Sequence, residues 1–230
     1  MKLKNLFAMA ALTLLAAACS NDDEPKTATS LGGEAKTNLD VTAYDKWTYI
    51  NLKTGDTKQY DDTSAWIYTD GTETPAKDDA NIDMEWHIAI HRYEIKTNNG
   101  EAYDTKQQDF NSVTSLPANV TWTKDQVVSW ESQQAENVAS PLEVITDMTK
   151  MMQGSVGYSK EPSVNTVLCN WVNKVETGSM PPVVYTPTKN VLVVKFADGS
   201  WTKLQFTAAG NTETNKSGYV TFNYEFFSID

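Results

Sequence analysis

Residues 191–206 read VLVVKFADGSWTKLQF, two runs rich in apolar residues that are separated by the pair Asp198-Gly199. An Asp-Gly pair readily adopts the positive φ angles that a tight turn between antiparallel strands requires. Two such runs with a turn between them are typical of a β-hairpin. The stretch therefore predicts two paired antiparallel strands.

Several other stretches have the same character. Residues 46–52 are followed by Thr54-Gly55-Asp56, which predicts another strand and turn. Apolar side chains alternate with polar ones at Val220, Phe222, Tyr224 and Phe226. This is the period of a half-buried strand. A further strand is expected to place Met84, Trp86, Ile88 and Ile90 on one face, and His87, Ala89, His91 and Tyr93 on the other.

Two segments have helical spacing. Ser140-Pro141-Leu142-Glu143 is typical of a helix start, and Gly154 is placed to end that helix. Between them, one apolar stripe is expected to contain Val144, Ile145, Met148, Met151 and Met152. Residues 164–171 fit either a short helix or a buried strand. We therefore expect one mainly β, antiparallel domain over residues 39–230, with one or two short helices.

The composition excludes several functional classes. The 230 residues contain 19 Lys and Arg against 30 Asp and Glu, a net charge of −11. This sign opposes binding to nucleic acid or to anionic lipid surfaces. Only two Cys and two His are present, too few for a disulfide framework, a Cys-rich zinc module or an iron–sulfur cluster.

The N-terminus predicts export and a lipid anchor. Lys2 and Lys4 precede an apolar run over residues 6–18 that is too short to span a bilayer, so residues 1–18 are expected to be a signal peptide. The small residues before Cys19 resemble the processing box of bacterial lipoproteins, in which that cysteine receives the lipid. Residues 19–38 are expected to form a flexible tether. Cys169 is then expected to be a buried thiol.

The acidic residues 22–24 resemble the surface-export signal of lipoproteins in the Bacteroides group. They indicate the outer face of the outer membrane. Contact with the membrane is expected only through the lipid on Cys19.

Neither a zinc site nor an active site is indicated. His87 and His91 are four residues apart, a spacing that serves one metal ion on a helix. On a strand the same spacing covers about 13 Å, so structural or surface histidines are the better interpretation. No nucleophile elbow, phosphate-binding glycine loop or dinucleotide fingerprint is present. We therefore do not expect an enzyme, although a glycosidase-like pair among the thirty carboxylates stays open.

Methionine is the remaining candidate for a site. Apart from Met1 and Met9 the chain has five methionines, four of them between residues 148 and 180. Met180 lies in Gly178-Ser179-Met180-Pro181-Pro182, where two prolines restrict the backbone. Because Met commonly fills gaps in cores, both packing and ligand roles are open.

Residues 86–98, WHIAIHRYEIKTN, resemble the HmuY-type haem-binding lipoproteins of Bacteroidetes. Residues 46–55, the Met180-Pro181-Pro182 loop, residues 191–199 and residues 219–224 agree with that family as well. The resemblance implies a largely β domain that holds one haem b between two axial protein ligands. Some members use a His pair for this, and others use a Met pair.

The resemblance also implies which residues are the ligands. This chain lacks His at both ligand positions, and Met148 and Met180, 32 residues apart, match them. Met151 and Met152 are alternatives to Met148, because they lie three and four residues further along the predicted helix.

The resemblance further implies how the protein is used. We expect a surface haemophore that captures haem, with host haemoproteins as one source, and delivers it to a TonB-dependent outer-membrane receptor. The alternative is a surface lipoprotein that binds a protein or glycan through its aromatic-rich β surface, without a cofactor.

Overall fold

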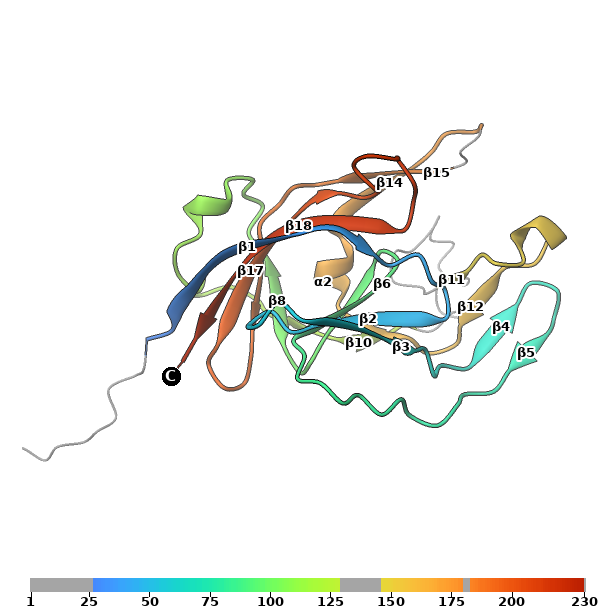
Figure 1. The fold of residues 1–230 in the computed structure, drawn as a ribbon, viewed down its shortest axis with the longest axis horizontal. Helices are drawn as coiled ribbons and strands as arrows, with labels where there is room; N and C mark the ends of the chain where they lie inside the picture. The colour runs from blue at the N-terminus through green and yellow to red at the C-terminus, as the bar shows by residue number, and fades with distance from the viewer. Residues whose placement is uncertain (1–26, 129–145, 180–182, 230) are drawn as a thin grey trace, which may run out of the picture.

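The structure is a computed structural model that describes residues 27–128, 146–179 and 183–229. It is built almost wholly from antiparallel strands (Figure 1). The strands are β1 (Thr29–Asp40), β2 (Lys46–Ile50), β3 (Thr57–Asp61), β4 (Trp66–Tyr68), β5 (Glu73–Thr74), β6 (Ile88–His91), β7 (Glu94–Thr97), β8 (Glu101–Asp104), β9 (Thr123–Lys124), β10 (Gln126–Val127), β11 (Thr146–Asp147), β12 (Gly157–Ser159), β13 (Ser163–Val164), β14 (Val172–Glu176), β15 (Val183–Pro187), β16 (Leu192–Lys195), β17 (Trp201–Ala208) and β18 (Tyr219–Ser228). The helical segments are η1 (Phe110–Ser112), η2 (Met151–Gln153) and α2 (Thr166–Cys169).

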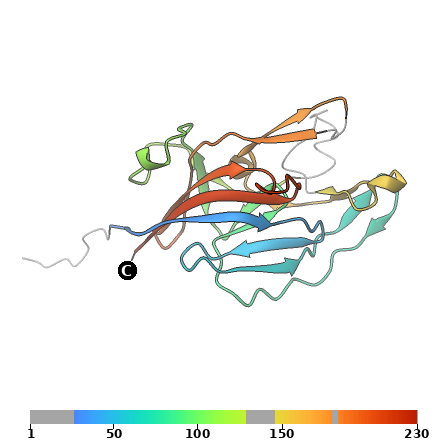
Figure 2. The ribbon, with the colours of Figure 1, turned by 45° about the horizontal axis from the view of Figure 1, so that its top comes forward.

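Two sheets form the body of the domain. The first has the strand order β1-β18-β17-β16-β8-β9, and the second has the order β3-β2-β6-β7. Their facing side chains share one core, in which Ile50, Ile88 and Ile90 of the second sheet pack with Leu204 and Phe222 of the first. Figure 2 shows the two sheets as layers. The predicted mainly β, antiparallel domain is confirmed.

The predicted hairpins are also confirmed. β16 pairs with β17 around Asp198-Gly199, where Gly199 has φ +88° and Phe196 N–H donates to Ser200 O at 2.9 Å. β2 pairs with β3 around Gly55, whose φ is +80°. Along β18, every second side chain from Val220 to Phe226 is buried, as the alternation predicts.

β1 corrects the expected N-terminal boundary. The tether predicted for residues 19–38 is wrong for residues 29–38, because these belong to β1, which pairs with β18 from Thr29 to Asp40. A side chain supports the pairing, because Tyr224 Oη donates to Glu34 Oε2 at 2.6 Å. Lys36 Nζ also ties β1 to the turn between β2 and β3, where it donates to Gly55 O at 2.5 Å. β1 is polar and mostly exposed. Its sequence therefore lacks the alternation of apolar and polar residues that would predict a strand.

β6 is shorter than the predicted strand. Ile88 and Ile90 lie in the main core, whereas Met84 and Trp86 pack on a second cluster with Trp47 and Ala89. Placing all four on one face is therefore wrong. The regular strand begins only at Ile88, and alternation does not hold across the irregular chain before it.

Residues 164–171, for which the sequence fits either a short helix or a buried strand, contain the short helix α2. α2 begins after Asn165, whose side chain accepts from Leu168 N–H at 3.1 Å as an N-cap. Leu168 and Cys169 are fully buried, so the expectation of a buried Cys169 thiol is confirmed. None of the helices in the described residues has the length and apolar character needed to cross a membrane.

Both histidines are core residues that face different neighbours. The His87 ring lies against Phe226, with centroids 4.6 Å apart, and its Nδ1 accepts from Leu52 N–H at 3.1 Å. His91 is fully buried against Trp47, and its Nε2 donates to Tyr44 O at 2.7 Å. The structural interpretation of the pair is therefore correct.

The environment of His87 predicts a pH dependence of stability. Burial lowers the pKa of the imidazole below its usual 6.5, and a protonated Nδ1 could not accept from Leu52. As pH falls below 6.5, the unfolded chain takes up this proton before the folded one does. The free energy of unfolding is thus expected to decrease from about pH 7 to about pH 5.

Urea unfolding of the wild type and of His87→Gln across this range measures the effect. The glutamine can still accept from Leu52 but does not titrate, so we expect the variant to have a shallower slope by a fraction of one proton. Equal slopes in the two proteins would assign the pH dependence to other groups.

Candidate functional site

The segments that flank the two methionines matched by the family resemblance form two projecting arms. The first arm is the sheet β11-β12-β4-β5, and the second is the hairpin β14–β15. Both arms extend from the same end of the two-layer body in Figures 1 and 2. Met148 directly follows β11. Met180 falls between β14 and β15 in the sequence and lies outside the described residues.

The predicted methionine helix is wrong where the chain is described. Thr146 and Asp147 form β11 and pair with β12, and only Met151–Gln153 make a short 3-10 turn. Gly154, at φ +79°, does end this turn, and its N–H donates to Met151 O at 2.9 Å. The predicted start at residues 140–145 lies outside the described residues.

The three methionines of the first arm therefore do not share a helical stripe. Met148 is half-buried, Met151 is 41% exposed and Met152 is 90% exposed. Met151 N–H donates to Met148 O at 3.1 Å, so one turn holds all three. What distinguishes the three methionines is therefore how far each side chain is exposed to solvent.

Tyr68 of β4 braces the turn that contains Met148. Its hydroxyl donates to Asp147 Oδ2 at 3.2 Å, and the other carboxylate oxygen accepts from Thr149 N–H at 2.9 Å. Lys150 Nζ lies 4.3 Å from the centroid of the Tyr68 ring. Burial, and then the charge of Asp147, raise the pKa of the Tyr68 hydroxyl.

Gly157 makes this contact possible. A Cβ at residue 157 would lie 2.6 Å from Cε1 of Tyr68, so only glycine lets the ring lie across β12. Sequence reasoning missed both Tyr68 and Gly157. Tyr68 is 79 residues from Asp147, and no local pattern signals such a contact.

The second arm is anchored in the core at its base. β14 and β15 pair from Val172–Pro187 to Glu176–Val183, and Trp171 and Tyr93 hold the base in place. Tyr185 stacks on Tyr93 with ring centroids 3.9 Å apart, and Thr188 N–H donates to Trp171 O at 2.8 Å. At the tip, Gly178 has a φ of +67°. The arm thus presents its tip from a rigid base.

Exposed apolar side chains gather around the two arms. The described residues leave seven large apolar side chains exposed, and five of these lie on the first arm, on the hairpin or on the neighbouring β10: Val127, Met151, Met152, Val175 and Val184. Exposed apolar side chains on these elements are available to an apolar partner. A flat apolar ligand with a soft metal centre fits neutral thioether donors in these surroundings.

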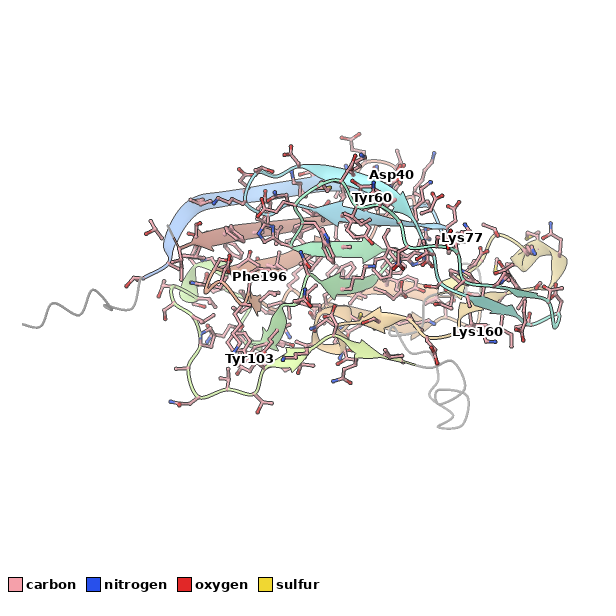
Figure 3. The ribbon with its side chains drawn as sticks, turned by 90° about the horizontal axis from the view of Figure 1, so that it is seen from below. Asp40, Tyr60, Lys77, Tyr103, Lys160 and Phe196 are labelled. Carbon is pink, nitrogen blue, oxygen red and sulfur yellow. The ribbon has the colours of Figure 1, made fainter. Side chains whose placement is uncertain are left out.

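Other features of the described residues fit a ligand less well. No group of three or more His, Cys, Asp or Glu among them is arranged to hold a metal ion. A shallow groove of about 230 Å³ is lined by polar side chains that include Tyr103, Thr105 and Gln107. Figure 3 shows Tyr103 well apart from Lys160, which directly follows β12 of the first arm. The groove is smaller than the roughly 300–1,000 Å³ usual for ligand pockets.

Known proteins resemble this chain over most of its length. The sequence model of the HmuY protein family matches residues 43–224. The crystal structure of an apo HmuY analog from Tannerella forsythia is 35% identical, with a TM-score of 0.70 over 88% of this chain and 98% of that one. No curated protein matches the chain.

Two further crystal structures come from Bacteroides species. A protein of Bacteroides vulgatus, assigned as HmuY-like and haem-binding, is 27% identical, with a TM-score of 0.58 over 84% of this chain and 90% of that one. A protein of Bacteroides fragilis, assigned as a lipoprotein, is 25% identical, with a TM-score of 0.61 over 86% of this chain and 94% of that one. Since the family match runs from the start of the second sheet through both arms and into β18, the chain belongs to the HmuY protein family.

Proposed function

We propose that this protein binds haem between its two arms and carries it as a surface haemophore. The observation that carries the proposal is the family match, which includes the segments of Met148 and Met180. The haem-binding assignment of the Bacteroides vulgatus relative supports it. The cargo is haem b, and no catalytic turnover is involved.

The axial ligands in this proposal are Met148 and Met180. Met151 and Met152 are the alternatives on the first arm. Thioether sulfur is neutral and soft, so it favours ferrous over ferric iron and raises the reduction potential relative to imidazole. A thioether also has no proton to gain, so mild acid does not weaken it as it weakens a histidine ligand.

The arms supply the remaining contacts. The exposed apolar side chains that flank them would cover the faces of the porphyrin. Lys150 lies two residues from Met148 and places one cation beside the site, in a protein whose net charge is −11. That cation favours the carboxylates of haem, which the overall charge would repel.

The remainder of the proposal concerns location and partners. Residues 1–18 would be removed as a signal peptide, Cys19 would carry the lipid, and the chain between Cys19 and β1 would be the tether. The protein would face the cell exterior from the outer membrane, receive haem from sources such as host haemoproteins, and pass it to a TonB-dependent receptor. The lipoprotein assignment of the Bacteroides fragilis relative supports the anchor.

A haem titration of the chain from residue 20 onward tests the binding function. We expect a Soret shift that saturates at one haem per chain and that is tighter in the presence of dithionite than in air. Absence of any Soret shift in either state would reject the proposal. That result would favour the cofactor-free lipoprotein that binds a protein or glycan through its aromatic surface.

Tyr68→Phe tests how the first arm holds its ligand. The change removes the hydrogen bond to Asp147 and leaves the ring in place, so we expect ferrous haem to bind about three- to tenfold more weakly. The free energy of unfolding should change by less than about 1.5 kcal/mol. Haem titration and urea unfolding measure the two effects.

Tyr60→Phe is the matched control, because the Tyr60 hydroxyl also donates to a carboxylate, that of Asp83. Tyr60 lies on β3 in the body of the domain (Figure 3), and its hydroxyl does not bond to the turn of Met148. Loss of the Tyr60 hydroxyl should leave the affinity for haem unchanged. An equal loss of affinity in both variants would show that Tyr68 does not act through the turn of Met148.

A further inference from the structure

Met152 is the most exposed large apolar side chain among the described residues. It is 90% exposed, and it does not belong to any of the three apolar clusters that these residues form. This exposure leaves the side chain open to an approaching ligand. Methionine has a flexible, unbranched side chain, and here it presents its thioether sulfur to solvent.

Met152 is held close to Met148. The hydrogen bond from Met151 N–H to Met148 O closes a turn, which keeps the Cα atoms of residues 148 and 151 within about 7 Å. Met152 is the next residue, and the bond from Gly154 N–H to Met151 O fixes its backbone. One turn therefore carries a half-buried thioether at Met148 and a fully exposed one at Met152.

We propose that Met152 is a capture ligand that binds the iron of arriving haem before Met148 does. The inference rests on the proposed haem function with Met148 as the final ligand. The handover is a ligand exchange on one face of the iron: the bond from Met152 Sδ breaks as the bond from Met148 Sδ forms. Both donors are neutral thioethers, so the iron stays ferrous and no proton moves.

The difference in exposure makes such a step useful. A broad planar ligand that arrives from solvent meets the exposed Met152 sulfur before the half-buried Met148 sulfur. A transient bond at the rim lowers the barrier to entry, and it lowers the barrier to exit equally because both use the same path. Met152 should therefore speed loading and release without changing the equilibrium affinity.

Stopped-flow mixing of the lipid-free chain with ferrous haem under dithionite tests the proposal in Met152→Leu. Leucine keeps the apolar volume and removes the sulfur. We expect the association and dissociation rate constants to fall together by about fivefold or more, with an unchanged Kd and final spectrum. Met84→Leu is the control, because Met84 packs against the cluster of Trp47 and Ala89 in the body of the domain.

Metal-free protoporphyrin IX, followed by its fluorescence, separates coordination from apolar contact. It has no iron, so Met152→Leu should not change its association rate. Equal slowing of protoporphyrin and haem would overturn the proposal and make Met152 an apolar contact. Unchanged haem rates, or a faster dissociation with a raised Kd, would overturn it as well.

Failure of the underlying function has a different signature. A wild-type chain without a Soret shift contradicts haem binding itself, and an unchanged final spectrum in Met148→Ala contradicts the final ligand. Neither result depends on Met152.

Discussion

Replacing Met148 or Met180 with alanine is expected to convert the ferrous haem complex from six-coordinate low-spin to five-coordinate. Each change removes one of the two axial bonds, and the transient bond from the exposed Met152 is expected to be too weak to replace that of Met148 at equilibrium. The affinity for ferrous haem should fall by about 10- to 100-fold, which corresponds to about 1.4–2.8 kcal/mol. Titration under dithionite, followed in the Soret and visible bands, measures both effects.

Met151→Ala and Met152→Ala are the matched controls, since they remove thioethers from the same turn. Both should retain the equilibrium affinity and the six-coordinate spectrum. Loss of coordination in the Met151 or Met152 variant alone would move the first ligand to that residue. An unaltered spectrum in both Met148→Ala and Met180→Ala would contradict the assignment of these two residues as the axial ligands.

Trp171→Ala is expected to cause the largest loss of stability of any single change considered. Trp171 is 1% exposed, its ring lies 4.3 Å from that of Phe206, and its Nε1 donates to Tyr93 O at 2.9 Å. Alanine would leave a cavity at the base of the β14–β15 arm and an unpaired buried carbonyl. The free energy of unfolding should fall by about 3–5 kcal/mol, measured by urea denaturation.

Val175→Ala provides the comparison on the same arm. Val175 is 54% exposed, so its truncation should change the free energy of unfolding by less than about 0.5 kcal/mol. Similar losses in the two variants would mean that the arm is not anchored through Trp171.

The elements predicted well from the sequence are those with local signals. The hairpin around Gly199 combines apolar runs with a turn pair that has the required φ, so neighbouring residues contain all the information. β18 alternates from Tyr219 to Phe226 because one of its faces lies on the core there. Neither element depends on a distant contact to be recognised.

β1 and the methionine segment were predicted wrongly because distant pairings determine them. β1 is polar, and its partner β18 lies almost 200 residues away, so the hydrogen bonds that order it leave no local pattern. Residues 140–154 have helix signals at both ends, yet β11 pairs with β12, which pairs in turn with β4. Tertiary pairing overrides local propensity there.

The candidate site was predictable only in part. Its methionines are visible in the sequence, and the family resemblance singles out Met148 and Met180. The exposure difference among Met148, Met151 and Met152 requires coordinates, as does the Tyr68–Asp147 contact over 79 residues. Spacing along the chain can identify candidate ligands. It does not identify the distant side chains that hold those ligands in place.

The ferrous absorption spectrum of the wild-type chain at one equivalent of haem tests the central claim most directly. Two methionine ligands predict a six-coordinate, low-spin ferrous complex with sharp visible bands. A five-coordinate, high-spin ferrous spectrum, or a spectrum identical to that of free haem, would contradict the claim that the two arms hold haem through a pair of thioethers.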